Sequence, residues 1–271
     1  MRSVFPAARP LLLGALLLFG ACATRPPASD PEAVAEFEQT NDPLEPSNRT
    51  MFDVHEAIDR AVLEPVARAY RAVLPQPVRD GVRNALGNLR TPVILLNDLL
   101  QGQTERARTT LARFMVNSTI GLAGFIDVAE RWGTPGHNED FGQTLAVWGL
   151  GEGPYLFVPV LGPSNPRDLF GFGVDIVASP FTWIGQGVAV DAANWTRVGL
   201  TVLDTREALL DPIQDVRNTS LDPYATLRSA YRQRRAFEIQ NRDGQAGRTD
   251  PAGGPGFGQG VTTPGATPPG R

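Results

Sequence analysis

The apolar positions between residues 42 and 240 recur mostly at helical spacing. From Val78 to Leu89 they fall at i, i+4, i+7, i+8 and i+11, which places them on one stripe of a helix. Residues 105–120 form a second predicted helix, capped by Thr104, and a third covers about 188–210, through Trp195 and Leu209. In the second helix we expect three apolar side chains to face inward: Leu111, Phe114 and Met115.

Proline supports the same mainly helical interpretation. Several helix starts are predicted where a capping residue precedes a proline in the first helical position. These pairs are Thr91-Pro92, Asn165-Pro166, Asp211-Pro212 and Asp222-Pro223. The apolar run Tyr155–Leu161 is the main strand candidate, and Pro159 makes it an edge or irregular strand. We therefore predict a mainly α fold.

The stretch from Leu169 to Val190 is unusually apolar, with Asp175 as its one charge. Glycines and prolines interrupt it, and its longest uncharged run, Ile176–Val190, would rise only ~22 Å as a helix, too short for a ~30 Å hydrocarbon layer. Two interpretations are equally open: an element that dips into one leaflet, or a helical hairpin buried in a water-soluble core. The candidates for membrane-embedded side chains are Phe170, Phe172, Ile176, Phe181, Trp183 and Ile184.

The N-terminus predicts export and lipidation. Residues 1–21 have a basic start and a short apolar run that ends on small residues, as in a secretory signal. The sequence Phe19-Gly20-Ala21-Cys22 resembles a bacterial lipobox, in which the cysteine is acylated; an ordinary signal with an incidental cysteine is the alternative. Two or more acyl chains give stable anchoring, and Ala23 after the cysteine favours the outer membrane, by the sorting habit of bacterial lipoproteins.

After the signal of residues 1–21, composition divides the chain into three further segments. Residues 22–41 comprise the acylated cysteine and a polar, proline-containing tether, and residues 42–240 form the folded domain. Residues 241–271 contain nine Gly and five Pro with few bulky apolar side chains, so we expect them to be disordered.

Composition excludes several kinds of chemistry. All 25 basic residues are arginine, so no lysine can form a Schiff base or complete a P-loop. One cysteine and two histidines exclude thiolate zinc sites, CxxC redox chemistry and three-histidine metal clusters. The formal charge is −4, and removal of residues 1–21, with two arginines and no acid, makes it −6. An acidic body of this kind does not favour nucleic acid as a partner.

The remaining candidate sites have ordinary structural explanations. The glycines of Gly149–Tyr155 lack phosphate-loop spacing and indicate a turn between a helix and an extended segment. Among His137, Glu139 and Asp140, a metal site is less favoured than a surface turn with Asp140 as a helix cap. His55 is expected to be solvated.

The arginines at 228, 232 and 235 could hold phosphate, but a solvated helix face is the favoured interpretation. No GxSxG elbow is present, and no nucleophile, base and oxyanion donors assemble. We therefore predict neither an enzyme nor a bound metal or cofactor.

A series of ordered motifs resembles the VacJ/MlaA family of phospholipid-transport lipoproteins. The resemblance covers roughly residues 41–235. The motifs are Asn41-Asp42-Pro43-Leu44-Glu45, Asn48-Arg49, Phe52, Pro75-Gln76-Pro77-Val78-Arg79, residues 121–129 (GLAGFIDVA), Phe141-Gly142-Gln143-Thr144-Leu145, Gly149–Tyr155, Pro159, Gly162-Pro163, Arg167-Asp168 and Asp222-Pro223-Tyr224.

This resemblance implies a ring-like helical protein in the inner leaflet of the Gram-negative outer membrane, with an amphipathic central channel. It implies removal of misplaced phospholipid from the outer leaflet, a periplasmic phospholipid carrier as recipient, and association with a trimeric porin. Carried over to this chain, it makes lipid-path candidates of Val93, Leu96 and Leu100 in one helix and Gly149, Gly151, Gly153 and Tyr155 in the glycine-rich loop. For these residues a plain core or turn role is the alternative.

Two other functions remain open from the sequence. One is a structural lipoprotein that scaffolds a porin without moving lipid, and the other is a periplasmic lipid hydrolase that uses paired carboxylates.

Overall fold

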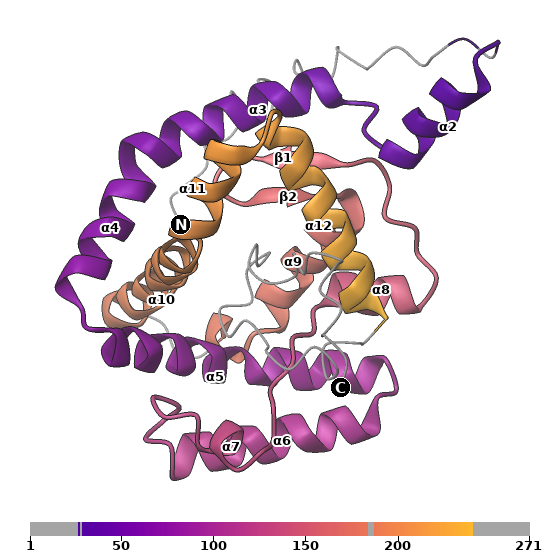
Figure 1. Ribbon diagram of the computed structural model, residues 1–271. Helices are drawn as coiled ribbons and strands as arrows, with labels where there is room; N and C mark the ends of the chain where they lie inside the picture. Colours follow the sequence, from indigo (N-terminus) through magenta and orange to yellow (C-terminus); the bar gives the residue numbers. More distant parts are fainter. Residues whose placement is uncertain (1–26, 28, 184–186, 241–271) are drawn as a thin grey trace, which may run out of the picture.

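The computed structural model describes residues 27, 29–183 and 187–240. Viewed along its axis, the main body is a ring of helices, and α2 (Pro31–Thr40) lies outside it (Figure 1). The expected ring-like, mainly helical fold is therefore confirmed. In the described residues, no helix is both long and apolar enough to cross a bilayer.

One continuous arc forms the first third of the ring. It consists of α3 (Glu45–Ile58), the π-helical turn η2 (Asp59–Leu63) and α4 (Glu64–Val73). Such a π turn inserts an extra residue into the helix and commonly accompanies a bend. Asp59, the first residue of η2, is fully buried, so the turn also places a carboxylate on the inner side of the arc.

The arc continues into a pair of packed helices. Pro75 separates α4 from α5 (Gln76–Leu100), and α5 packs against α6 (Thr104–Thr119). A loop with Leu122 and Ala123 at positive φ leads to the short helix α7 (Val128–Arg131), which packs on α6.

The third part combines two helices with a hairpin. Helix α8 (Phe141–Val147) packs against α9 (Pro166–Ala178), and between them β1 (Leu156–Val158) pairs antiparallel with β2 (Gly162–Ser164). The register joins Leu156 to Ser164, and the 3₁₀ turn η3 (Pro180–Thr182) follows α9.

The last three helices close the ring. Helix α10 (Val188–Ala208) packs on α4 and α5, α11 (Leu210–Thr219) on α4, and α12 (Pro223–Ile239) on α8 and β2 (Figure 1). A small aromatic core lies where α12, α3 and the hairpin meet; it comprises Tyr155, Phe157, Tyr224 and Tyr231, with Met51 and Phe52 packed against it.

Several local expectations are confirmed. Asn165 and Asp222 cap helices that begin at the following proline, and each side chain accepts the backbone N–H three residues on. Helices also cover the predicted regions 78–89, 105–120 and 188–210.

Other expectations are wrong. Pro92 lies inside α5, where the Thr91 hydroxyl donates to the Gly87 carbonyl instead of capping a new helix. Helix α6 begins at Thr104 without a side-chain cap, and α11 begins at Leu210, one residue before Asp211.

One further expectation is wrong, and one segment has more local structure than its composition indicates. Leu111 and Met115 are exposed rather than inward-facing, because α6 packs on α5 through its other side. The segment interpreted as a tether contains the ten-residue helix α2, which begins at Pro31 with Glu32 in its first turn, where an acid favours a helix.

Candidate functional site

Many polar side chains are buried between the elements of the ring, and many large hydrophobic side chains are exposed at its surface. Among the described residues, 19 polar or charged side chains are buried, against 11 hydrophobic ones, and 30 large hydrophobic side chains are exposed. Water-soluble domains bury charged groups only when these are paired, and they rarely expose large continuous apolar patches. The distribution of polarity over the whole ring is therefore the feature to explain.

Buried carboxylates of the arc hold α10 and α11. Arg206 donates to both oxygens of Asp59, at 2.5 and 2.8 Å, and Arg217 contacts Asp59 at 2.7 Å. Arg217 also binds Glu56 and Glu64, so one guanidinium joins three acids of α3, η2 and α4. Burial opposes the ionisation of Asp59, but the two guanidinium groups lower its pKa below the usual range.

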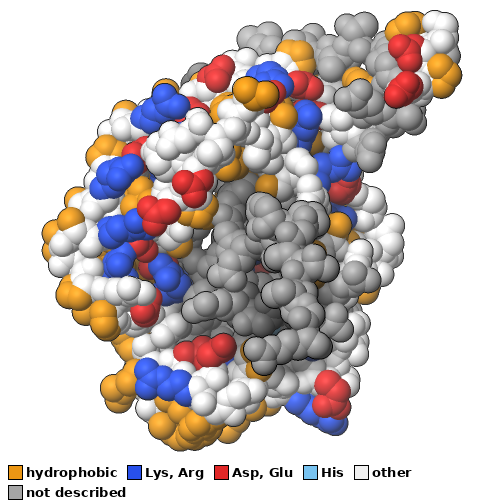
Figure 2. Space-filling model, in the orientation of Figure 1, with side chains coloured by type: hydrophobic (Ala, Val, Ile, Leu, Met, Phe, Trp, Pro, Cys, Tyr) orange, Lys and Arg blue, Asp and Glu red, His pale blue; other side chains and the backbone are white. Residues whose placement is uncertain are grey.

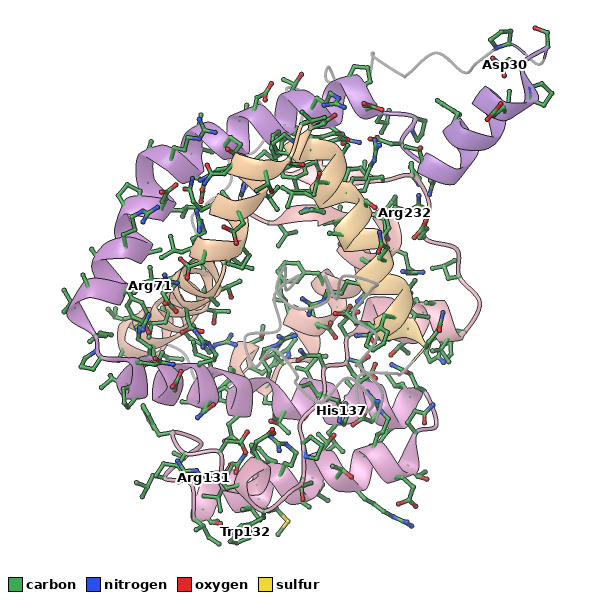
Figure 3. All side chains as sticks on the ribbon, in the orientation of Figure 1. Asp30, Arg71, Arg131, Trp132, His137 and Arg232 are labelled. Atoms are coloured by element: carbon green, nitrogen blue, oxygen red, sulfur yellow. The ribbon has the colours of Figure 1, made fainter. Side chains whose placement is uncertain are left out.

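A second cluster joins the same helices to α5. Glu207 accepts from Arg71 at 2.8 Å and from Arg83 at 3.0 Å, and it also pairs with Arg79. Asp204, one turn earlier on α10, contacts Arg83 at 3.0 Å. Figure 3 shows Arg71 on α4 pointing toward α10. Patterning of the sequence did not identify these acids, because a charged residue in a helix is ordinarily solvated.

Helix α12 carries a third set of buried ion pairs. Arg235 binds Asp140 at 2.6 and 2.7 Å and Asp168 at 2.8 Å, while Arg228 reaches Asp42 at 2.7 Å. Burial disfavours the charged form of Asp140, yet Arg235 holds the pKa of this carboxyl well below its usual range.

These arginines therefore do not form the solvated face expected from their spacing. Arg232, labelled in Figure 3, donates to the Thr40 carbonyl and to Glu152. All three guanidinium groups are held against carboxylates of other elements, and they close the ring.

The side chains of His137 and Glu139 are also buried, although the turn before them, residues 133–136, is at least partly exposed as expected. The His137 ring lies 2.9 Å from Asp98, and Glu139 accepts from Gln101 and Arg106. Asp140 caps α8 as expected, accepting from Gln143 N at 2.9 Å. The described residues contain no group of His, Cys, Asp and Glu that could hold a metal ion.

His55 is likewise not solvated. Its Nδ1 accepts the backbone N–H of Val160 at 3.0 Å, and its ring lies edge-on to Phe157. Burial lowers the pKa of the imidazole, which keeps the neutral, accepting form. The histidine thus holds the turn of the hairpin, in which Val160 has the unusual φ of +70°.

The lipid-path candidates of α5 divide by exposure. Val93 is buried, whereas Leu96 and Leu100 are exposed one helical turn apart. The Trp148 indole N–H donates to the Leu100 carbonyl at 3.1 Å, so the end of α8 lies beside these leucines. The structure therefore brings the α5 candidates close to the start of the glycine-rich loop.

Two of the three glycines in the loop have a backbone conformation that favours glycine. Gly149 and Gly153 have φ of +93° and +74°, while Gly151 lies outside this region and a Cβ there would meet open space. Tyr155 is only 2% exposed and lies in the aromatic core. Asn41 fixes the loop by donating to the Gly153 carbonyl at 2.8 Å.

The apolar stretch of α9 and η3 lies at the surface. Trp183 and Phe170 are 70% and 63% exposed, and Phe172 and Ile176 about half. Phe181 is partly buried, and Ile184 lies outside the described residues. This exposure contradicts the alternative of a hairpin buried in a soluble core.

The opposite side of α9 packs closely against α8. A Cβ on Gly171 would lie 2.3 Å from Gly142 N, so the two backbones approach in a way that only glycine permits. Asp175 accepts from Phe141 N and Asn97, and burial raises its pKa to about 6. Helix α9 is thus polar and tightly packed on one side and apolar and exposed on the other.

The predicted lipidation site, Cys22, and the predicted tail, residues 241–271, lie outside the described residues. Their roles remain predictions from the sequence.

Comparison with known proteins identifies relatives over most of the chain. A family model described as "MlaA lipoprotein" matches residues 40–238. "Intermembrane phospholipid transport system lipoprotein MlaA" of Escherichia coli (strain K12) is 36% identical over 233 residues, 84% of this chain and 86% of that protein. Its namesake from Haemophilus influenzae is 34% identical over 85% of this chain and 89% of its own length.

A solved structure supports the same relationship. It is described as "Structural basis for maintenance of bacterial outer membrane lipid asymmetry" and superposes with a TM-score of 0.63 at 35% identity. The match covers 73% of this chain and 98% of the solved one.

Proposed function

The chain belongs to the MlaA lipoprotein family, and on that premise we propose that it is an outer-membrane lipoprotein that removes misplaced phospholipid from the outer leaflet. The observation that carries the proposal is the reversed polarity of the ring, with buried ion pairs inside and exposed large hydrophobic side chains outside. Phospholipid is the proposed substrate, and lipid transport rather than bond chemistry is the proposed activity.

Moving a phospholipid between leaflets requires its polar headgroup to cross hydrocarbon. Moving a polar group into hydrocarbon without a hydrogen-bonding partner costs about 2–7 kcal/mol, and an unpaired charge costs far more. A ring with exposed apolar side chains sits in a leaflet at little cost, and polar groups that line its opening would offer the headgroup partners on the way through.

One part of the chain is proposed to contact the acyl chains of the leaflet, and another is proposed to border the lipid path. The exposed residues of α9 and of the turn after it, including Phe170, Phe172, Ile176 and Trp183, are proposed to lie among acyl chains, together with the partly buried Phe181. For Ile184, which lies outside the described residues, membrane contact is proposed from the sequence alone. Leu96 and Leu100 and the glycine-rich loop, Gly149 to Gly153, are proposed to border the lipid path. Val93 and Tyr155 support these elements from the core.

Partners and location follow from the same proposal. Acylation of Cys22 would anchor the ring on the periplasmic side of the outer membrane. A periplasmic carrier protein would accept the lipid, and a trimeric porin would hold the ring in place.

Deletion of the gene tests the transport function. We expect phospholipid to accumulate in the outer leaflet of the deletion strain and the purified lipoprotein to carry co-purifying phospholipid. Normal lipid asymmetry in the deletion strain would contradict transport.

The two alternatives give different results in the same experiments. A porin scaffold predicts that every variant unable to bind the porin loses asymmetry. A lipid hydrolase predicts release of fatty acid and lyso-lipid by the purified protein, which we do not expect.

A further inference from the structure

A polar hollow lies between the arc and α11, away from the exposed apolar surface of α9. Its volume is about 600 Å³, and its lining includes Arg60, Glu64, Arg68, Gln214 and Arg217. A second hollow of about 380 Å³ adjoins it and shares Arg60 and Arg217. Three guanidinium groups line the first hollow, and they share the carboxylates of Glu56, Asp59 and Glu64.

Two of these arginines have donors to spare. Arg60 contacts Glu56 through Nη2, and Arg68 contacts Glu64 through Nε and Nη2, so among the described residues Nη1 of both side chains and Nε of Arg60 make no hydrogen bond. Arg217, by contrast, uses its donors on Glu56, Asp59 and Glu64. Arg60 and Arg68 are 65% and 56% exposed, so both can turn toward a ligand.

The same helical segment presents an apolar stripe on its other side. Val62, Val66 and Val73 are exposed there, about half a helical turn away from Arg60, Glu64 and Arg68. Figure 2 shows arginines in a row over the viewed face of the arc, with hydrophobic side chains along its outer edge. The segment therefore has an apolar outer side and an inner side of paired arginines and acids.

We propose that the hollow between Arg60 and Arg68 binds the phosphate group of a phospholipid headgroup. This inference rests on the proposed function, and it names the place where the headgroup is held. Each arginine can donate its free Nη1–H to a phosphate while it keeps its ion pair, and two guanidinium groups, eight residues apart on one helical side, can hold the phosphate together. The neighbouring carboxylates would keep such binding weak enough for release.

The test compares binding of short-chain phosphatidylglycerol, the matching diacylglycerol and inorganic phosphate by the purified, acylated protein in detergent. The test variant is R60Q/R68Q, and R108Q is the matched control, because Arg108 is equally exposed and pairs with Glu105 in its own helix. The variant R60K/R68K keeps both positive charges but replaces each planar guanidinium with an ammonium group.

We expect R60Q/R68Q to bind phosphatidylglycerol about tenfold more weakly, with R60K/R68K in between. R108Q should stay within about twofold of the parent protein, because an exposed pair contributes little. Diacylglycerol binding should be the same in all four proteins, and unchanged thermal unfolding of R60Q/R68Q would show that its fold is intact.

Each other outcome has a definite meaning. Undiminished phosphatidylglycerol binding by R60Q/R68Q overturns the site and leaves the transport function standing. Inorganic phosphate that competes as strongly as the lipid overturns the headgroup as ligand in favour of free phosphate. Failure of the parent protein to bind any phospholipid, with normal asymmetry in the deletion strain, overturns the proposed function as well.

Discussion

The junction of α12 with α8 and the outer side of α9 are neighbours in the fold and opposites in chemistry. At the junction, Arg235 is buried between Asp140 and Asp168, where a soluble protein would ordinarily place leucine or valine. On α9, Phe170 and Ile176 are exposed, where a soluble protein would place charge. Each arrangement is explained by the other, since hydrocarbon around a ring leaves its inside as the place for polar groups.

The two regions also depend on their surroundings differently. A buried ion pair is costly to desolvate and stabilises only when every partner is present, so the junction tolerates no single loss. An exposed apolar side chain contributes to membrane affinity roughly in proportion to its area, so losses on α9 should accumulate gradually.

Removing Arg235 should have the largest effect. Arg235→Met leaves Asp140 and Asp168 buried without their main cation, and we expect it to lower the free energy of unfolding by about 3–5 kcal/mol. Denaturant unfolding in detergent measures this loss. Arg108→Met, at an exposed pair, is the control and should change stability by less than about 1 kcal/mol.

The close approach of α8 and α9 should be the next most sensitive feature. Gly171→Ala forces the two backbones apart, since its Cβ would lie 2.3 Å from Gly142 N, and we expect a loss of about 1–3 kcal/mol. Gly173→Ala, two residues along α9, meets nothing within 4 Å and should be neutral or slightly stabilising. Equal effects of the two substitutions would contradict the tight helix contact.

Substitutions on the outer side of α9 should affect membrane binding and not stability. F170S/W183S is expected to leave unfolding in detergent unchanged and to weaken vesicle binding of a non-acylated Cys22→Ser protein by about 2 kcal/mol or more. Co-sedimentation with vesicles measures this change. Loss of stability without loss of vesicle binding would show that these side chains pack within the protein.

The glycine-rich loop should give the smallest effect. Gly153→Ala places a side chain at positive φ and 3.2 Å from Pro166, and we expect a loss of about 1–2 kcal/mol. Gly151→Val, by contrast, carries no penalty for positive φ, because Gly151 lies outside that region and a Cβ there meets open space. If Gly151→Val nevertheless impairs lipid asymmetry at normal stability, the loop acts on the lipid path rather than on the fold.

Helical spacing and capping residues predicted much of the fold. Asn165, Asp222 and Asp140 could be identified as caps because a short polar side chain directly before a helix accepts a backbone N–H of its first turn. The stretch of α9 could be identified because it is apolar but too interrupted by Gly and Pro to span a bilayer. The ring shape was predicted from the ordered family motifs and not from the periodicity of apolar positions.

The ion pairs of the interior could not be predicted in the same way. Asp59 and Arg206 are 147 residues apart, and in a helical pattern each resembles an ordinary solvated residue. Hydrophobic patterning assumes that water surrounds the protein. That assumption predicts the wrong side for Leu111 and Met115, which are exposed, and for the α12 arginines, which are held in ion pairs.

The closure of the ring by α12 has a consequence for biogenesis. The contacts of Tyr224 and Arg228 with Asp42, and of Arg232 with Thr40, join residues 182, 186 and 192 positions apart. Such distant pairs form late, because the intervening chain must first be ordered. The ring can therefore close only after its last helix has been made, and a truncation before residue 223 should yield an unclosed chain that proteases remove.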